Sequence, residues 1–538
     1  MIKYQQLKMH PGYTMRDVIQ KIADNLRIAD SDIKNLKILR ESIDARKKPD
    51  VFFILSVAFC CGQEERMIAK YGKKYDLSVY QEKRIRFPEI SHKDAAGKRP
   101  VVIGTGPAGL FCGYYLSRAG LKPILLERGK PVEERIKDVE AFWNGGKLMK
   151  DSNVQFGEGG AGTFSDGKLN TLNKDPFGYQ REVLELFVRM GANPAILYEQ
   201  KPHVGTDQLI AIVKNLRSEI IRLGGEVRFE TKVTEFLTEE TTDGKRICGV
   251  CTEDGSRIDT DRVVPAIGHS ARDTFEVLYQ KGFAMEAKEF AVGYRVQHKQ
   301  RMIDISQYGE ANLGKLPPAP YKLTARAKDG RGVYSFCMCP GGYVVNSSSE
   351  DGRLCINGMS YSDRGSENAN SAIIISVTPK DFGTESPLSG VYFQRDLEKR
   401  AYDKGNGRIP VQRLVDFQND TVTDKAGSVV PIIKGQYAYA NLRGILPKYL
   451  ETAFLEGMEQ FEHKIPGFSD DDVIVAGIEA RTSSPVRINR DKRCEATNIK
   501  GVYPCGEGAG YAGGITSAAA DGLRVALMLM EDLGGEEK

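Results

Sequence analysis

Four residues near position 100 have the types and spacing of a dinucleotide-binding site. Gly104, Gly106 and Gly109 follow an apolar run and precede a helical pattern, and Glu127 closes the next apolar run. In such a unit the glycines allow a tight turn, a close approach of backbone to a diphosphate, and close packing of helix on strand. The helix N-terminus favours the anion, and the carboxylate can accept both hydroxyls of an adenosine ribose. Residues 101–128 are therefore predicted to bind a dinucleotide.

A second glycine-rich motif, YPCGEGAGYAGGI, lies near the C-terminus. It indicates a short strand, a turn at Gly506 and Glu507, a glycine-rich loop, and a helix of small residues that opens near Ile515. We expect Glu507 to hold a ribityl or ribose hydroxyl. The first amides of the helix, around Gly514, Ile515 and Thr516, would face the N1 and C2 carbonyl of a flavin, where negative charge gathers on reduction.

A third glycine-rich stretch, VQFGEGGAGTFSDGKLNTLN, follows no long apolar strand and is therefore not predicted to be a second dinucleotide turn. Its glycines could let backbone lie against a flat ligand, with Ser165, Asp166 and Lys168 supplying polar groups beside it. A flexible surface loop is the alternative interpretation.

Catalytic side chains are less clearly marked. Cys337 and Cys339 would share a face of a strand, so a redox pair and two packing residues are both open interpretations. The CxxC of Cys248 and Cys251 is interpreted as small apolar strand residues, because no second CxxC completes a zinc site, and no metal is expected.

Histidine and arginine supply the remaining candidates. A proton donor or an anion-binding group could be His203, His269 or His298, although a structural histidine is the commoner case. Arg295 and Arg481 are candidate carboxylate clamps, because guanidinium binds planar anions through two hydrogen bonds. An internal ion pair is the alternative interpretation of either arginine.

Length and charge set the outer limits. The 538 residues predict two to four domains, and a net charge of +4 does not indicate a nucleic-acid or membrane partner for the whole chain. Residues 1–100 are more basic, with 21 Lys and Arg against 13 Asp and Glu. The N-terminus lacks the apolar core of a signal peptide, and ten scattered cysteines suit a reducing compartment, so a cytoplasmic location is expected.

The predicted elements give an α/β protein with four segments: 1–95, an N-terminal α+β module; 96–282, the first part of the dinucleotide domain; 283–465, an inserted β-rich α+β substrate domain; and 466–538, the second part of the dinucleotide domain. In the first module, MIKYQQLKM reads as a strand and Thr14 as the cap of a helix that ends near Leu26. Gln63 to Pro100 reads as a polar linker. A strand, a hairpin and a return strand that ends at Gly268 look like the three-stranded sheet attached to flavin-binding Rossmann domains, in which Val233 would contact adenine.

With these motifs together, the chain resembles the FAD-dependent dehydrogenases of the glutathione-reductase-like superfamily. More narrowly, it resembles the group described as NAD(FAD)-utilising dehydrogenases, through the blocks ARKKPD, KPHVGTDQL, GHSARDTFEVL, FCMCPGGYVV and YPCGEGAGYAGGI. The resemblance implies a GR2-type Rossmann domain with FAD as cofactor. The expected FAD-binding residues are Gly104, Gly106, Pro107, Ala108, Gly109, Glu127, Arg128, Gly159, Gly160, Ala161, Lys168, Val233, Gly268, Gly506, Glu507, Gly513, Gly514, Ile515 and Thr516. Glu507 departs from the usual Asp of the superfamily, which lengthens its reach.

The expected function is oxidoreduction, with hydride passing between a substrate and flavin N5. No second strand, GxGxxG, helix and acid unit follows residue 170, so a dedicated NAD(P)H domain is not expected. The electron partner could be a small substrate, a quinone-like acceptor or another protein. Two alternatives are a flavin-dependent monooxygenase or halogenase, and a flavoprotein scaffold whose basic N-terminal module binds RNA or protein.

Overall fold

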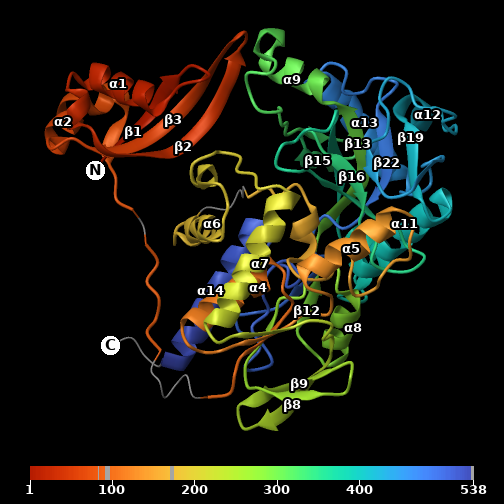
Figure 1. Ribbon diagram of the computed structural model, residues 1–538. Coiled ribbons are helices and arrows are strands. Elements are labelled where there is room, and N and C mark those ends of the chain that lie inside the picture. The colour runs from red at the N-terminus through yellow and green to blue at the C-terminus, as the bar shows by residue number, and fades with distance from the viewer. Residues whose placement is uncertain (83, 91–96, 170–174, 535–538) are drawn as a thin grey trace.

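The computed structural model describes residues 1–82, 84–90, 97–169 and 175–534 (Figure 1). Residues 91–96 of the predicted linker and residues 170–174 of the third glycine-rich stretch lie outside the described residues. The N-terminal unit, residues 1–79, stands beside the rest of the molecule in Figure 1, and its longest hairpin points toward helix α9 (Gln300–Tyr308).

The N-terminal unit is an antiparallel four-stranded sheet with two helices. In chain order its elements are β1 (Ile2–Met9), α1 (Met15–Leu26), β2 (Lys34–Lys47), β3 (Asp50–Cys60), α2 (Glu64–Tyr75) and β4 (Leu77–Val79), and the strand order is β2-β3-β1-β4. Thr14 caps α1 through a capping box with Asp17, which confirms the predicted start of that helix. Helix α2 was predicted as linker, because only Met67 and Tyr71 of this polar segment are buried.

A parallel sheet follows, in the strand order β11-β5-β6-β7. Residues 501–505 run alongside β11 through backbone hydrogen bonds to Val263 and Pro265. The strands are β5 (Val101–Ile103), β6 (Ile124–Leu126), β7 (Glu226–Arg228) and β11 (Val263–Pro265). The helices are α4 (Pro107–Arg118), α5 (Val132–Trp143), α6 (Tyr179–Arg189), α7 (Thr206–Arg222), α8 (Arg272–Gln280) and α14 (Ile515–Gly534), of which α14 and α7 both pack on α4 (Figure 1).

The hairpin that precedes β11 forms the predicted three-stranded sheet. Its order is β10-β9-β8, and all its pairings are antiparallel. The strands are β8 (Val233–Thr241), β9 (Gly244–Thr252) and β10 (Arg257–Asp259). The first residue of β8, Val233, is thereby placed at the end of the sheet that faces the parallel strands.

The largest sheet has seven strands in the order β14-β15-β18-β13-β22-β19-β21, and only β19 and β21 pair in parallel. Its strands are β13 (Phe290–Lys299), β14 (Thr324–Arg326), β15 (Gly332–Cys339), β18 (Asn368–Val377), β19 (Ile409–Arg413), β21 (Tyr437–Tyr439) and β22 (Ile474–Glu479). Around it are β16 (Tyr343–Asn346), β17 (Ile356–Met359), β20 (Ile433–Lys434), α10 (Pro379–Phe382), α11 (Ser389–Gly405), α12 (Leu414–Gln418) and α13 (Lys448–Glu462). A separate pair joins β12 (Met285–Ala287) to β23 (Val486–Ile488).

Strand β22 differs from the sequence expectation. The sequence predicted that the second part of the dinucleotide domain begins at residue 466. In the structure, β22 instead pairs with β13 and β19 inside the seven-stranded sheet. All six of its residues are buried, so its sequence carries no alternation that would tell one sheet from another.

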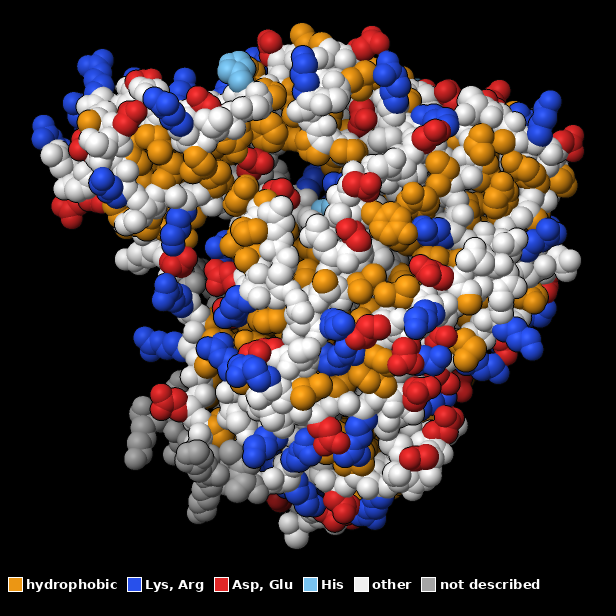
Figure 2. Space-filling model, viewed as in Figure 1, with side chains coloured by type: hydrophobic (Ala, Val, Ile, Leu, Met, Phe, Trp, Pro, Cys, Tyr) orange, Lys and Arg blue, Asp and Glu red, His pale blue; other side chains and the backbone are white. Residues whose placement is uncertain are grey.

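The N-terminal unit is hydrogen-bonded to two later segments of the chain, at residues 198–200 and at Asn312. Glu41 in β2 exchanges backbone hydrogen bonds with Tyr198 and Gln200, and Asn312 donates a hydrogen bond to the carbonyl of Pro49 in the β2–β3 turn. Over the face shown in Figure 2, acidic and basic side chains are interspersed. Within the described ranges, no helix combines the length and the apolar character needed to cross a membrane.

Candidate cofactor and substrate site

A cavity of about 520 Å³ lies where the parallel sheet, the third glycine-rich stretch and the seven-stranded sheet meet. One part of its wall is the glycine turn after β5, another is the start of α14, and a third is the end of β15 with Phe336 and Cys337. Pockets for organic ligands commonly enclose about 300–1,000 Å³, so the cavity has the size of a ligand site.

The glycine turn has the tight geometry that its motif predicts. A Cβ on Gly104, whose φ is +101°, would lie 2.5 Å from the carbonyl oxygen of Ala266, and one on Gly109 would lie 1.9 Å from the oxygen of Gly104. Gly106 faces Gly160 across the cavity wall, and a Cβ on Gly160 would lie 3.0 Å from the Gly106 Cα. Two glycines thus face each other, which leaves backbone open to a ligand.

Glu127 is buried on the cavity wall at the end of β6. Its Oε2 accepts hydrogen bonds from the Thr105 N–H at 2.9 Å and hydroxyl at 2.7 Å, and its Oε1 accepts from the N–H groups of Gly129 and Gly157. The Glu127 carboxylate therefore joins three loops. A ribose hydroxyl that binds it would share the two carboxylate oxygens with these protein donors. Its neighbour Arg128 also lines the cavity and is paired with Asp151 and Asp273.

Arg135, which the sequence did not single out, holds the third glycine-rich stretch in place. This fully buried side chain of α5 donates hydrogen bonds to five backbone carbonyls, those of Asn153, Val154, Gly157, Glu158 and Gly160. Burial lowers its pKa to about 10. A lone arginine in a polar helix carries no local signal of this role, because its partners lie 18 to 25 residues away.

The start of α14 forms the opposite part of the wall. Gly513, Gly514, Ile515 and Thr516 line the cavity, and a Cβ on Gly513 or Gly514 would meet nothing within 4 Å. The Thr516 hydroxyl donates a hydrogen bond of 2.6 Å to the carbonyl of Leu169, which fixes the helix start beside Lys168. The first N–H groups of a helix lack partners within the helix, so this end is suited to negative charge.

Lys168 brings a positive charge to the cavity wall. Its Nζ lies 3.4 Å from Oδ2 of the buried Asp166, and the Lys168 side chain is 28% exposed. Burial opposes the charge, but Asp166 together with Cys339 and Cys337 outweighs that effect, and the pKa of Lys168 is raised. Arg364 and His203 also face Asp166, at 3.6 and 3.7 Å.

Arg295 supports the wall from the centre of the seven-stranded sheet. Its Nε and Nη2 bind both oxygens of Glu479, at 2.7 and 2.9 Å, and its Nη1 donates to the carbonyl of Cys337 at 3.1 Å. Glu479 and Cys337 line the cavity, whereas Arg295 is fully buried behind them. Of the two interpretations of Arg295, the geometry is that of an internal ion pair.

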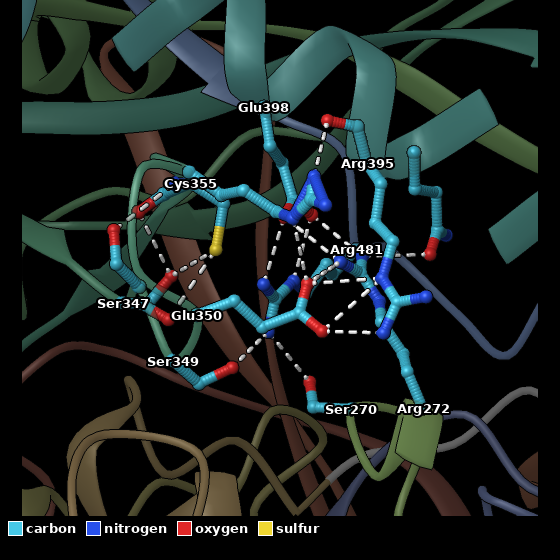
Figure 3. A network of polar contacts seen from close by, with 12 residues as sticks. Ser270, Arg272, Ser347, Ser349, Glu350, Cys355, Arg395, Glu398 and Arg481 are labelled. Carbon is cyan, nitrogen blue, oxygen red and sulfur yellow. Dashed lines mark hydrogen bonds and ion pairs between the residues drawn. The ribbon is translucent and has the colours of Figure 1, made fainter. Parts of the chain in front are cut away.

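Arg481 also lies in an ion-pair network, drawn in Figure 3. Its Nε and Nη2 donate to the two oxygens of Glu398, each at 2.8 Å, and its Nη1 donates to Ser349 and Ser270. Arg272 binds the same carboxylate at 2.6 and 2.9 Å. The network joins the segment after β11 to α11 and to the end of β22, and both donor faces of Arg481 are occupied although it lines the cavity.

Most of the residues predicted to bind the cofactor line this cavity. Those on the wall are Gly104, Gly106, Pro107, Ala108, Glu127, Arg128, Gly160, Ala161, Lys168, Val233, Gly268, Glu507, Gly513, Gly514, Ile515 and Thr516. Gly109, Gly159 and Gly506 stand behind it. The Gly506 N–H is bound by Asp521 at 2.7 Å, and the role of Gly109 is close packing on Gly104.

Of the catalytic candidates, some line the cavity and some do not. Cys337, His269 and Arg481 line the cavity, and the Nδ1 of His269 lies 3.6 Å from Glu507. His203 and Cys339 do not line it. His203 is bonded through Nε2 to the carbonyl of Tyr361, and burial lowers its pKa below the usual value.

The sequence did not single out several other residues of the wall, among them Gln155, Phe336, Asn357 and Glu479. Phe336 lies within β15, Glu479 ends β22, Asn357 lies in the short β17 and Gln155 lies in a loop, so their shared position depends on long-range strand pairing.

The donor set of the cavity fits a dinucleotide. Its wall combines two open glycine turns, two helix starts and the buried Glu127, whose chemistry suits a diphosphate, a ribose and a flavin ring. A family model described as "FAD-dependent protein, C-terminal domain-like" matches residues 289–482, and one described as "Domain of unknown function" matches residues 1–60. FAD is the cofactor of this chain.

Among solved structures, the chain is similar to glycine oxidase from Bacillus cereus, at 12% identity, over 81% of this chain and 95% of that chain, with a TM-score of 0.35. It is also similar to the tetracycline destructase Tet(55), at 11% identity over 81% of each chain, with a TM-score of 0.37. Similarity in sequence is much higher to an uncharacterised protein of Clostridium beijerinckii, at 47% identity over 516 residues, or 95% of each chain. The protein described here therefore belongs to one family with this Clostridium beijerinckii protein.

Proposed function

We propose that the protein is an oxidoreductase in which hydride passes between a substrate and N5 of FAD. FAD, when bound, supplies the two-electron chemistry, and the protein supplies binding, orientation and electrostatics. The observation that carries the proposal is the continuity of one cavity. It joins the glycine turn after β5 to the start of α14 and to a wall from the seven-stranded sheet.

In this proposal the GR2-type Rossmann arrangement holds the cofactor. Gly104, Gly106 and Gly160 would lie against the diphosphate, Val233 against the adenine, and the start of α14 against the flavin end. The support for this assignment is that these residues line one cavity and that both helix starts, at Pro107 and Ile515, open onto it.

The reacting substrate would then lie between the start of α14 and the end of β15. Phe336 and Asn357 offer an apolar surface and an amide there, and Lys168 holds a proton on Nζ beside them. Because Asp166 raises the pKa of Lys168, the ammonium persists at neutral pH and stabilises a negative charge on a substrate or on a reduced ring.

The test is the absorption spectrum of the purified protein, recorded before and after anaerobic addition of NADH and then of NADPH. Flavin bands that bleach with one nucleotide would support a nicotinamide donor. Flavin bands that persist would direct the search to other substrates and to protein partners. A protein without flavin bands after reconstitution with FAD would overturn the proposal, and rapid formation of an oxygen adduct on mixing reduced protein with oxygen would favour the monooxygenase alternative.

A further inference from the structure

We propose that Cys337 and Cys339 form a reversible disulfide that exchanges two electrons with FAD, which makes this pair a second redox centre of the protein. The inference rests on the proposed position of FAD in the cavity. It concerns the two thiols at the end of β15, where the strand reaches the cavity wall.

A bulge in β15 sets the positions of the two thiols. The register of β15 against β18 shifts between Phe336 and Cys339, and Cys337 has a positive φ of 44°. Cys337 therefore reaches the cavity, whereas Cys339 is fully buried behind it. The Cys339 thiol lies within hydrogen-bonding distance of the Cys337 sulfur, and it also contacts the carbonyl of Cys337 at 3.2 Å.

The two thiols differ in acidity. The hydrogen bond from Cys339 lowers the pKa of Cys337, burial opposes this, and the positive charges of Lys168 and Arg295 lower it further. Burial raises the pKa of Cys339, so its proton stays in place. The pair thus consists of an accessible thiolate and a buried thiol, which is the arrangement of an attacking and a resolving cysteine.

Arg295 holds this arrangement rigid. Its Nη1 binds the Cys337 carbonyl at 3.1 Å and lies 4.0 Å from the Cys339 sulfur, while Glu479 fixes the other nitrogens. The turn is therefore fastened at the centre of a seven-stranded sheet. Because the Cys339 Sγ already lies 3.2 Å from the Cys337 carbonyl, bridging the two sulfurs requires local rotation of the two side chains.

The position of the pair connects it to the cofactor. Lys168 acts electrostatically on Cys337, and the next residue, Leu169, accepts the hydrogen bond from Thr516 at the start of α14. Cys337 and Thr516 line the same cavity. A flavin ring held at the start of α14 would consequently lie on the side of the cavity that carries the thiolate.

The electron balance is simple. Oxidation of the pair forms one S–S bond and releases two electrons and two protons, counted from two thiols. FAD takes up two electrons and two protons to give the reduced flavin. In the opposite direction, reduced FAD breaks the S–S bond and restores both thiols. A disulfide across one intervening residue is strained, and strained disulfides are the more easily reduced ones, so reduction of the bridge by the flavin is the favoured direction.

The test uses the FAD-loaded full chain without oxygen. The protein is oxidised with diamide, desalted, and a sample is denatured, labelled with N-ethylmaleimide and digested with trypsin. Tryptic peptide 332–353 contains Cys337 and Cys339 as its only cysteines, and peptide 247–257 contains Cys248 and Cys251. The second peptide is an internal control, because residues three apart on a strand point to opposite faces.

We expect peptide 332–353 to be unlabelled and lighter by two hydrogens, and peptide 247–257 to carry two labels. The flavin of the oxidised protein is then photoreduced and left in the dark. Its absorption should return by one flavin per disulfide, while peptide 332–353 becomes doubly labelled. Cys337→Ser and Cys339→Ser should each abolish this dark recovery.

Either of two results on peptide 332–353 would overturn the inference: a disulfide that does not form, or one that persists beside reduced flavin. Failure of the proposed function is a separate observation, because a protein that does not retain FAD shows no flavin bands at the outset. Dark recovery that is unchanged in both serine variants would also contradict a role for the pair.

Discussion

Arg135 packs against Gly157 so closely that a Cβ on Gly157 would lie 2.4 Å from the Arg135 Cδ. Gly157 also has a φ of +111°, which favours glycine. Gly157→Ala should therefore displace the loop that lines the cavity and weaken FAD binding at least about tenfold, which equals about 1.4 kcal/mol. The flavin-to-protein ratio after dialysis measures the effect.

The matched control is Gly244→Ala. Gly244 has a φ of +101°, but a Cβ there would meet nothing within 4 Å, and it does not line the cavity. This variant carries the backbone strain alone, so it should keep its flavin. Equal loss of flavin in both variants would show that the contact with Arg135 is not the cause.

Arg135→Lys should separate the charge of this residue from its hydrogen bonds. A lysine keeps the charge but cannot reach five carbonyls from one position, so buried acceptors would be left without donors. We expect the free energy of unfolding to fall by about 3 kcal/mol or more, with flavin loss, measured by urea unfolding and absorption. The exposed Arg222→Lys should change the free energy of unfolding by less than about 0.5 kcal/mol. A similar loss in the two variants would contradict the stabilising role of the Arg135 hydrogen bonds.

Glu398→Gln should destabilise the junction drawn in Figure 3. Glu398 is fully buried and neutralises both Arg272 and Arg481, which hold its pKa at about 2 against the cost of burial. Loss of the charge leaves two buried guanidinium groups short of a partner, at a cost of about 3–5 kcal/mol. Thermal unfolding should show a lower Tm than for Glu140→Gln on the exposed face of α5, and an unchanged Tm would refute the assignment.

His298 should make the stability of the protein pH-dependent. Burial lowers its pKa from 6.5 to about 4, and its Nε2 is bonded to the carbonyl of Phe468. The unfolded chain then binds a proton that the folded chain does not, so stability is lost as the pH falls from 6.5 toward 4. In His298→Gln the Tm should depend less on pH over this window, whereas the exposed His463→Gln should follow the wild type.

Lys168→Gln should raise the pKa of the Cys337 thiol, because a positive charge near the thiolate is removed. The rate of iodoacetamide labelling at Cys337, followed on peptide 332–353, should have its pH midpoint shifted upward by up to about one unit. The exposed Lys315→Gln should leave the midpoint in place. A midpoint that stays unchanged in Lys168→Gln would show that the lysine does not contribute to the low pKa of Cys337.

The sequence predicted the cavity best where a role depends on near neighbours. Gly109 packs on Gly104, five positions before it, so the spacing of the motif alone indicates this close packing, whereas the contact of Gly104 with Ala266 needs the neighbouring strand. The helix start at Ile515 is marked in the same way by the glycines before it. The residues of these motifs that lie on the cavity wall were therefore predicted by residue number.

The remaining features of the site depend on contacts between residues that are far apart in the sequence, which the spacing of a motif does not reveal. Arg135 reaches carbonyls 18 to 25 residues away, and Arg295 meets Glu479 across 184 residues. Cys337 and Cys339 were expected on one face, because regular strand geometry predicts that for alternate residues. The bulge in β15 separates them into a cavity residue and a buried residue, and that bulge is set by pairing with β18.

The backbone contacts of Glu41 give the N-terminal unit a mechanical connection to the cavity. Residues 198–200, which Glu41 binds, are followed closely by His203, and His203 forms an isolated bridge with Lys168 on the cavity wall. A partner that pulls the N-terminal sheet away must either break these bonds or carry residues 198–203 with it. A displacement of the first sheet of the chain would therefore reach the backbone of Lys168 on the cavity wall through residues 198–203.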